Sequence, residues 1–223
     1  MKKTRLAVFA SHYIGEATLN SCRDFRDLLK VQYVVTDDPA KKYTNAKNRI
    51  WNCGYDEELR SLVMRQCSKF GIPVIEGRIK SQATIDVLNS FQSDGILVSC
   101  FGQKLPHWLL EKVDYAAFNI HPVIAGESLA RTRGPRPLLL AAESHATRIQ
   151  LVIHRMTTEF DNGEIVARSV SVELPKQTRL WQNTPQKYRR EILAYWQLLS
   201  TITAEMLQKE LPSLFGSAVN TPV

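Results

Sequence analysis

The stretch Leu6-Ala7-Val8-Phe9-Ala10, LAVFA, is a short apolar run that follows a basic leader and predicts a buried strand. A second run at residues 31–36, VQYVVT, is rich in β-branched side chains and predicts another strand. Between them, residues 17–29 have apolar positions compatible with a helix. A helix-sized crossover between two strands indicates a parallel sheet, because parallel neighbours cannot be joined by a tight turn.

The same alternation continues along the chain and predicts a doubly wound, Rossmann-like α/β fold with a mainly parallel sheet. Two late strands, separated by a turn that contains Asp161-Asn162-Gly163, predict that the sheet becomes mixed there. Helical spacing over 184–207, with Pro185 near the start, predicts a C-terminal helix that covers the sheet or forms a dimer seam. The other predicted elements are helices 57–70 and 82–91 and strands 72–75, 95–99, 116–120, 150–156 and 164–172.

Composition indicates an ordinary globular protein. With 223 residues and 44% apolar side chains, we expect one catalytic domain over 1–223, with its C-terminal helix and short tail from about residue 184. No apolar run approaches the roughly 20 residues that cross a bilayer. Four cysteines lack metal-ligand or disulfide spacing, which predicts a reducing, cytoplasmic location. The formal charge of +7 favours anionic ligands or only solvates the surface.

The stretch Phe118-Asn119-Ile120-His121-Pro122, FNIHP, carries the first candidate for chemistry. Asn119 and His121 are two residues apart and therefore lie on one side of the predicted strand, near its carboxyl end, where open α/β sheets bind ligands. Proline lacks an N–H, so we expect Pro122 to end the strand pairing and leave His121 at the mouth of a cleft. Asp161 in FDNG would complete a set of amide, imidazole and carboxylate suited to acyl transfer.

The residues alone leave a structural alternative open. In that alternative His121 only ends a strand, Asn119 forms a turn and Asp161 begins a D-N-G turn.

Several motifs together resemble the folate-dependent formyltransferase family, which includes glycinamide ribonucleotide, methionyl-tRNA and sugar N-formyltransferases. They occur in the family's order over roughly residues 5–172. The motifs are Val98-Ser99-Cys100-Phe101-Gly102-Gln103-Lys104-Leu105-Pro106, FNIHP, Arg133-Gly134-Pro135-Arg136-Pro137, Val152-Ile153-His154-Arg155-Met156 and Asp161-Asn162-Gly163.

The resemblance implies an enzyme of one-carbon metabolism that transfers a formyl group from N10-formyltetrahydrofolate to an amine, without a metal. It implies that Asn119, His121 and Asp161 are catalytic. Asn119 and protonated His121 would stabilise the developing oxyanion, while Asp161 orients His121 and helps to move the proton of the amine.

The resemblance also implies a folate site that reads the pterin through the main chain. The expected folate-binding residues are Phe101, Gln103, Lys104, Leu105, Met156, Thr157, Thr158 and Phe160. Core packing is the alternative for Phe101, Leu105 and Met156, because pockets are also lined by apolar groups. His154 is typical of a half-buried strand histidine, and His12 shows no usable pattern.

The sequence departs from the family around the acceptor. Residues 123–134 form a longer loop than is typical, with Val123 in place of the customary serine, and residues 11–16, SHYIGE, lack the glycine- and serine-rich phosphate loop of the glycinamide ribonucleotide enzymes. After Leu211 only a dozen residues remain, so we expect no tRNA domain and a small acceptor.

Among small acceptors we favour an amino-sugar nucleotide. Basic and aromatic side chains in the long loop 37–54 and just after it could meet its diphosphate and its rings: Lys41, Lys42, Lys47, Arg49, Trp51 and Tyr55. A solvated charged loop is the alternative. We expect no membrane or nucleic-acid partner, and a monomer or homodimer. The other open functions are a formyltetrahydrofolate hydrolase, a glycinamide-ribonucleotide-type transferase and a non-catalytic folate- or nucleotide-binding module.

Overall fold

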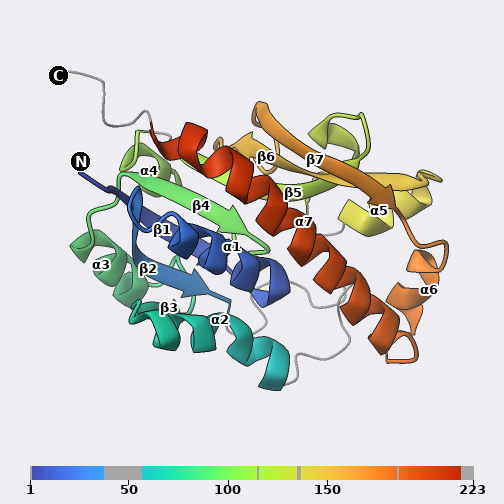
Figure 1. The fold of residues 1–223 in the computed structure, drawn as a ribbon, viewed down its shortest axis with the longest axis horizontal. Helices are drawn as coiled ribbons and strands as arrows, with labels where there is room; N and C mark the ends of the chain where they lie inside the picture. The colour runs from blue at the N-terminus through green and yellow to red at the C-terminus, as the bar shows by residue number, and fades with distance from the viewer. Residues whose placement is uncertain (1, 38–56, 115, 135–136, 185, 217–223) are drawn as a thin grey trace.

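The sheet contains seven strands in the order β3-β2-β1-β4-β5-β6-β7 within the described part of the chain (Figure 1). The computed structural model describes residues 2–37, 57–114, 116–134, 137–184 and 186–216. The strands are β1 (Thr4–Ala10), β2 (Leu29–Thr36), β3 (Val74–Glu76), β4 (Gly95–Ser99), β5 (Ala117–Ile124), β6 (Arg148–Arg155) and β7 (Ile165–Glu173).

Strand direction confirms the predicted mixed sheet. The pairs among β3, β2, β1, β4 and β5 are parallel, whereas β5 pairs with β6 and β6 with β7 in antiparallel fashion. Strands β1 and β4 are buried along nearly their whole length, as expected where helices cover both faces of a parallel sheet.

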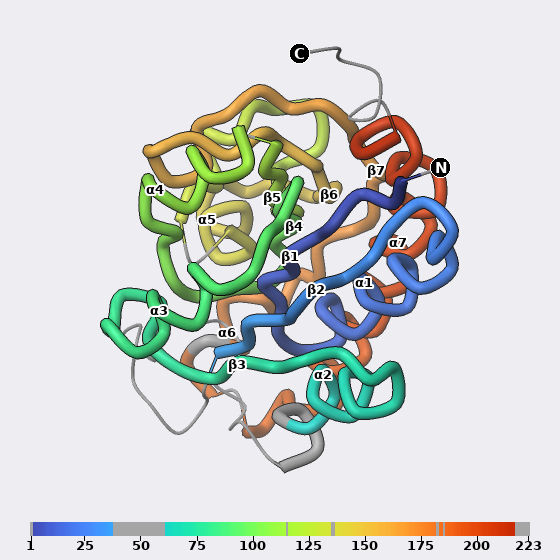
Figure 2. The backbone as a smooth tube through the Cα atoms, turned by 90° about the vertical axis from the view of Figure 1, so that its left-hand side faces the viewer, coloured from blue at the N-terminus to red at the C-terminus, as the bar shows by residue number. Residues whose placement is uncertain are grey.

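Helices cover the sheet on both sides. In Figure 2 the strands run between α1, α2 and α7 on the right and α3 and α4 on the left. Successive side chains of β1 point to opposite faces of the sheet. Leu6 and Val8 pack in the apolar cluster with α1 and α7, and Phe9 packs in the cluster with α3 and α4. The helices are α1 (His12–Asp24), α2 (Glu57–Phe70), α3 (Gln82–Ser90), α4 (His107–Glu111), α5 (Pro137–Glu143), α6 (Thr178–Asn183) and α7 (Arg189–Gly216), with a short 3₁₀ helix at Leu129–Arg131.

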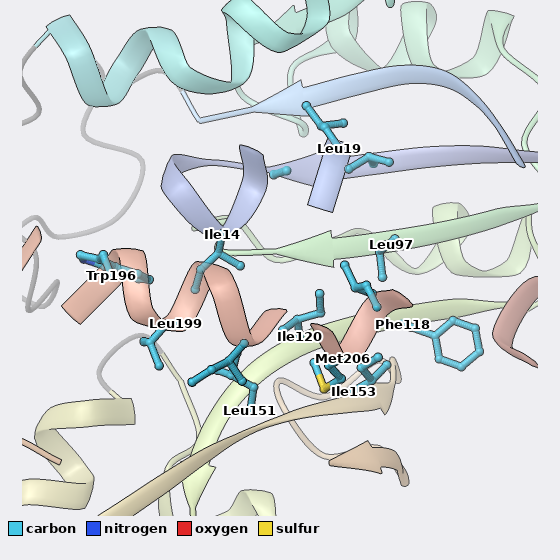
Figure 3. Packing of buried hydrophobic residues seen from close by; sticks show 14 of the residues in the cluster. Ile14, Leu19, Leu97, Phe118, Ile120, Leu151, Ile153, Trp196, Leu199 and Met206 are labelled. Carbon is cyan, nitrogen blue, oxygen red and sulfur yellow. The ribbon is translucent and has the colours of Figure 1, made fainter. Parts of the chain in front are cut away.

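The C-terminal helix covers the sheet, as its periodicity predicts, but it is longer than expected. Trp196, Leu199 and Met206 pack with residues of α1 and the central strands (Figure 3). The helix continues to Gly216 because Leu211 and Phe215 are also buried. Pro185 lies outside the described residues.

Gly95 at the start of β4 lets the end of α7 approach the sheet. A Cβ atom at this position would lie 2.6 Å from Phe215 Cε1, and Phe215 is held edge-on against Phe118 at 5.4 Å between ring centroids. We expect Gly95→Ala to destabilise the fold by about 1–3 kcal/mol, because the ring has no free space to move into. Urea unfolding measures this change. Gly216→Ala, with no atom within 4 Å of the new methyl group, is the matched control and should differ from wild type by less than about 0.5 kcal/mol.

Several predicted boundaries were wrong. The first helix spans His12–Asp24 instead of 17–29, since Leu29 already belongs to β2, and the third strand begins at Val74. The loop expected over 123–134 is shorter, because β5 continues to Ile124 and a 3₁₀ helix follows at Leu129–Arg131. The other long loop, 37–54, lies outside the described residues except for Asp37.

Pro122 does not end the strand pairing, which corrects the expectation from its sequence. It lies opposite Leu151 in the antiparallel pair of β5 and β6. The Met156 N–H donates to the Ala117 carbonyl at 2.8 Å, so these two residues form a hydrogen-bonded pair. Bonded and non-bonded pairs alternate along an antiparallel ladder. Pro122 lies an odd number of residues after Ala117 and therefore belongs to a non-bonded pair. Pairing with β4 has already ended at Ile120. Neither neighbour therefore requires the N–H that proline lacks.

None of the helices in the described segments is long and apolar enough to cross a membrane. Two of the cysteines, Cys22 and Cys67, are buried free thiols. Cys53 lies outside the described residues.

Candidate active site

A cavity of about 710 Å³ opens at the carboxyl ends of β1 and β4 and along β5. Asn119, His121 and Asp161 all line it. Asn119 and His121 come from the same side of β5, as their spacing predicts, and Asp161 comes from the loop between β6 and β7. The structure therefore brings the three residues together from positions about forty residues apart in the sequence.

The protonation state of the His121 ring follows from its two neighbours. Its Nε2 lies 2.8 Å from the Thr132 carbonyl oxygen, which can only accept, so Nε2 carries the proton. Its Nδ1 faces Asp161 Oδ1 at 3.7 Å. Burial lowers the pKa of His121, and the attraction of Asp161 and the Thr132 hydrogen bond offset this only in part. The ring is therefore neutral near pH 7, with Nδ1 available to accept a proton.

Asp161 is held by both of its oxygens. Oδ1 accepts from Asn119 Nδ2 at 3.2 Å, and Oδ2 accepts from the Gly134 N–H at 2.8 Å. Burial acts to raise the pKa of Asp161, but its other surroundings, which include His121 and the Gly134 N–H, outweigh it and hold this pKa below its usual value. Gly134 has a φ of +92°, a conformation that glycine adopts without strain, which explains the Arg-Gly step in the sequence.

His154 is the residue of this site that sequence reasoning missed. It is buried rather than half-buried, with 2% of its surface exposed. Its Nδ1 donates to the Arg155 carbonyl at 2.9 Å, so Nε2 has a lone pair and accepts from Asn119 Nδ2 at 3.1 Å. The signal was present in the strand pattern, because Asn119 and His154 are direct partners in the β5–β6 register.

The Asn119 amide is oriented by these contacts. The Asp161 carboxylate accepts but cannot donate, so the amide nitrogen of Asn119 must face it. Both of the N–H bonds of Asn119 are then engaged, one with Asp161 and one with His154.

Gly163 explains the last letter of the FDNG motif. A Cβ atom there would lie 1.7 Å from the Arg155 carbonyl oxygen. The loop that presents Asp161 can therefore approach the end of β6 only because residue 163 has no side chain. Across the cavity edge, Arg133 also contacts Asn162, so the loops on the two sides are joined.

Only some of the expected folate-binding residues line the cavity. Phe101, Gln103, Lys104 and Phe160 line the cavity. Leu105 is 5% exposed and packs in the core of the α3 and α4 face, and Met156 packs against the same cluster. Thr157 and Thr158 are exposed and do not line the cavity. Phe101 packs against this cluster too, so core packing describes Phe101, Leu105 and Met156, and a folate role for all eight residues stays a prediction.

The Gln103 side chain braces the cavity wall. Its amide donates to the Gly77 carbonyl at 2.9 Å and to Asp37 Oδ1 at 3.2 Å, while its oxygen accepts from the Ile79 N–H at 3.1 Å. Asp37 Oδ2 also accepts from the Gly102 N–H at 2.6 Å. These bonds join the ends of β2, β3 and β4 into one edge. In the described segments, no three metal-ligating side chains gather into a possible metal site.

The sequence matches the family model described as formyl transferase over residues 4–180. The methionyl-tRNA formyltransferase of Anaplasma marginale is 28% identical over 136 residues, which cover 61% of this chain and 40% of that protein. A methionyl-tRNA formyltransferase of Staphylococcus epidermidis is 29% identical over 70% of this chain and 45% of its own length. The matched part of the chain thus spans less than half the length of these relatives.

Solved structures show the same fold. A phosphoribosylglycinamide formyltransferase from Bacillus halodurans has a TM-score of 0.60 at 20% identity and is matched over 95% of this chain and 98% of its own. A formyltetrahydrofolate deformylase from Pseudomonas syringae has a TM-score of 0.55 at 18% identity, over 87% of this chain and 62% of its own. The chain belongs to the formyl transferase family, which confirms the resemblance seen in the sequence.

Proposed function

We propose that the protein is an N-formyltransferase that moves the formyl group of N10-formyltetrahydrofolate to the amine of a small acceptor. The observation that supports this most is the buried pair of His121 and Asp161, which line the cavity together. The unprotonated Nδ1 of His121 faces a carboxylate that can stabilise the imidazolium once a proton has been accepted.

The proposed reaction uses this pair for proton transfer. The amine nitrogen attacks the formyl carbon, a new carbon–nitrogen bond forms, and the bond from the formyl carbon to N10 breaks. His121 accepts the amine proton and returns it to N10, so that tetrahydrofolate leaves as the neutral amine. The resemblance implied a His121 that is protonated from the start, but its lowered pKa favours the neutral form. We therefore assign His121 as the base first and the acid second.

Asn119 has a different role in this proposal from the oxyanion role that the resemblance implied. Its two N–H bonds already bind Asp161 and His154. We propose that Asn119 holds the carboxylate of Asp161 in place, and that His154 in turn holds the amide of Asn119.

Replacement of His154 tests this chain of contacts. His154→Leu removes the acceptor for Asn119, and we expect the transfer rate to fall about tenfold, since the unpaired amide no longer fixes Asp161. His154→Gln supplies an oxygen acceptor and should recover part of that loss. Ring ¹⁵N NMR checks the geometry independently of turnover: a proton on Nδ1 of His154 agrees with it, and a proton on Nε2 contradicts it.

The pH dependence distinguishes a base from a preformed imidazolium. Because burial lowers the His121 pKa below its usual value of about 6.5, the neutral base is present at pH 7 and is lost only when the pH falls through this lowered pKa. We expect kcat/KM to be flat near neutrality and to fall on the acid side. Stability should follow the same sign, since the unfolded state binds a proton more readily. A rate that rises between pH 7.5 and 6 would contradict the assignment.

The functional assay separates the open alternatives. The protein is incubated with N10-formyltetrahydrofolate and candidate amines, and tetrahydrofolate, formate and formylated amine are measured. Amine-dependent formylation supports the transferase. Formate release at an undiminished rate without amine indicates a hydrolase, and tight folate binding without turnover, unchanged in His121→Ala, indicates a binding module. No release with any amine together with no folate binding contradicts the proposal.

The acceptor is the finer part of the proposal. The reasons for an amino-sugar nucleotide were side chains between Lys41 and Tyr55, which lie outside the described residues. It therefore belongs in the panel of candidate amines beside simpler amino sugars. We also propose one catalytic domain, supported by the single sheet that holds every described strand. A cytoplasmic location, the lack of a nucleic-acid partner and the monomer or homodimer state stay predictions.

A further inference from the structure

The side chains that line the cavity form two groups, which we call arms, because their apolar members belong to the two clusters on opposite faces of the sheet. On the α3 and α4 side the cavity is lined by three cations, Arg78, Lys80 and Lys104, which form the cationic arm. On the α1 and α7 side lies a second arm, which we name the aromatic arm. It is lined by His12, Ile14, Ile120, Pro122, Pro137 and Trp196. Asn119, His121 and Asp161 lie where the two arms meet.

His12 and Trp196 form the end wall of the aromatic arm. Their rings are stacked, with centroids 5.7 Å apart and an angle of 7° between the ring planes. His12 begins α1 directly after β1, whereas Trp196 comes from α7, so the wall joins two segments that are far apart in the sequence. Ile14 and Trp196 belong to the same apolar cluster (Figure 3).

His12 holds its ring there with a strained backbone. Its φ is +62°, a conformation that costs a non-glycine residue of order 1 kcal/mol and that concentrates at ligand sites. His12 is also 5% exposed, so its ring is fixed by packing while its edge reaches the cavity. A strained, preset side chain at a cavity wall is suited to positioning a ligand.

The start of α1 lacks a glycine-rich turn that would let an anion approach the backbone closely, although helix N-termini often bind anions. Its glycine, Gly15, serves packing instead: a Cβ atom there would lie 3.0 Å from Val63 Cγ2 and 3.1 Å from the Ala10 carbonyl carbon. Among the described lining residues, every lysine and arginine belongs to the cationic arm.

We propose that the aromatic arm binds the acceptor through the apolar face of an uncharged ring, with the amine directed at His121 and with no phosphate or carboxylate in the arm. This inference rests on the proposed transferase function and names the acceptor class. A sugar ring and an aromatic ring both have the required face. The arm and the reaction centre are open to each other, because His121 and the residues of the arm line the same cavity.

Matched amines test the proposal without donor present. The probes are D-glucosamine against D-glucosamine 6-phosphate and benzylamine against 4-aminomethylbenzoate, titrated by tryptophan fluorescence. We expect the neutral-ring member of at least one pair to bind about tenfold or more tightly than its anionic partner. The fluorescence change should be lost in Trp196→Phe. Tighter or equal binding of both anionic members, or no binding of either neutral-ring probe, overturns the inference.

A variant of His12 provides the second test. Glycine tolerates the φ of +62°, so His12→Gly removes the ring without adding backbone strain. We expect the KM for the bound amine to rise about tenfold while kcat changes little, since only uniform binding is lost. Leu198→Ala, on the exposed side of α7, is the control and should leave KM unchanged. An unchanged KM in His12→Gly contradicts the role of the wall.

The transferase function and the assignment of the aromatic arm can be contradicted separately. A neutral-ring amine that binds at Trp196 without any tetrahydrofolate release leaves the arm assignment intact and contradicts the transferase. Tetrahydrofolate release with the phosphorylated or carboxylated amines alone supports the transferase and overturns the aromatic arm.

Discussion

Replacing Asp161 with asparagine is expected to lower the formyl-transfer rate by about a hundredfold to ten-thousandfold. Asparagine keeps the shape of the side chain but has an NH₂ group, with two N–H donors, where Asp161 has its second acceptor oxygen. The amide would therefore place a donor against either Asn119 Nδ2 or the Gly134 N–H, both of which now donate to the carboxylate. The positive charge that develops on His121 would also lose its counter-charge, which lies 3.7 Å away in a buried site.

The rate of Asp161→Asn is measured with saturating donor and compared with a matched carboxylate. Asp86→Asn removes a negative charge from the exposed face of α3 and should behave as wild type. Circular dichroism of both variants shows whether the fold is retained. A folded Asp161→Asn protein with more than about a tenth of the wild-type rate contradicts the role of the carboxylate in proton transfer.

Gly163→Ala is expected to have the largest effect on stability. The new methyl carbon would lie 1.7 Å from the Arg155 carbonyl oxygen and 2.7 Å from its carbon, and backbone atoms at the end of β6 cannot move as a flexible side chain can. Arg155 also holds its neighbours, because its N–H donates to the Glu164 carbonyl and its carbonyl accepts from His154 Nδ1. The loop that carries Asp161 must therefore swing away from β5.

We expect this change to cost about 3 kcal/mol or more, which corresponds to a fall in Tm of roughly 6–12 °C for a chain of this size. Transfer activity should be lost as well, even below the new Tm, since Asp161 leaves Asn119. Gly126→Ala is the graded control: φ is +81° there but no atom lies within 4 Å, so only the backbone strain of about 1 kcal/mol applies. Wild-type Tm and rate in Gly163→Ala would contradict the geometry of the loop.

The elements that could be predicted from the sequence are those with local signals. The apolar run at β4 predicts that strand with its observed bounds, and the helix 57–70 is likewise confirmed. The spacing of Asn119 and His121 places them on one side of β5, as observed. A short-range pattern of this kind needs no knowledge of which strands are neighbours.

The parts that could not be predicted depend on contacts between distant segments. Pro122 continues β5 because its missing N–H falls where no strand needs it, and that depends on the register with β6. The position of His154 beside Asn119 depends on the same register. The role of His12 in the cavity wall depends on its stacking with Trp196, which lies far away in the sequence. Each of these is a property of the folded sheet and not of the local sequence.

The central claim is tested most directly by following the formyl group itself. N10-formyltetrahydrofolate labelled with ¹³C at the formyl carbon is incubated with the protein and an accepted amine, and the label is located by ¹³C NMR. We expect it in the formamide of the amine, and we expect that signal to fall at least about a hundredfold in rate in His121→Ala. Label that appears as formate at the same rate with or without amine, or formamide formed equally well by His121→Ala, would contradict formyl transfer by this site.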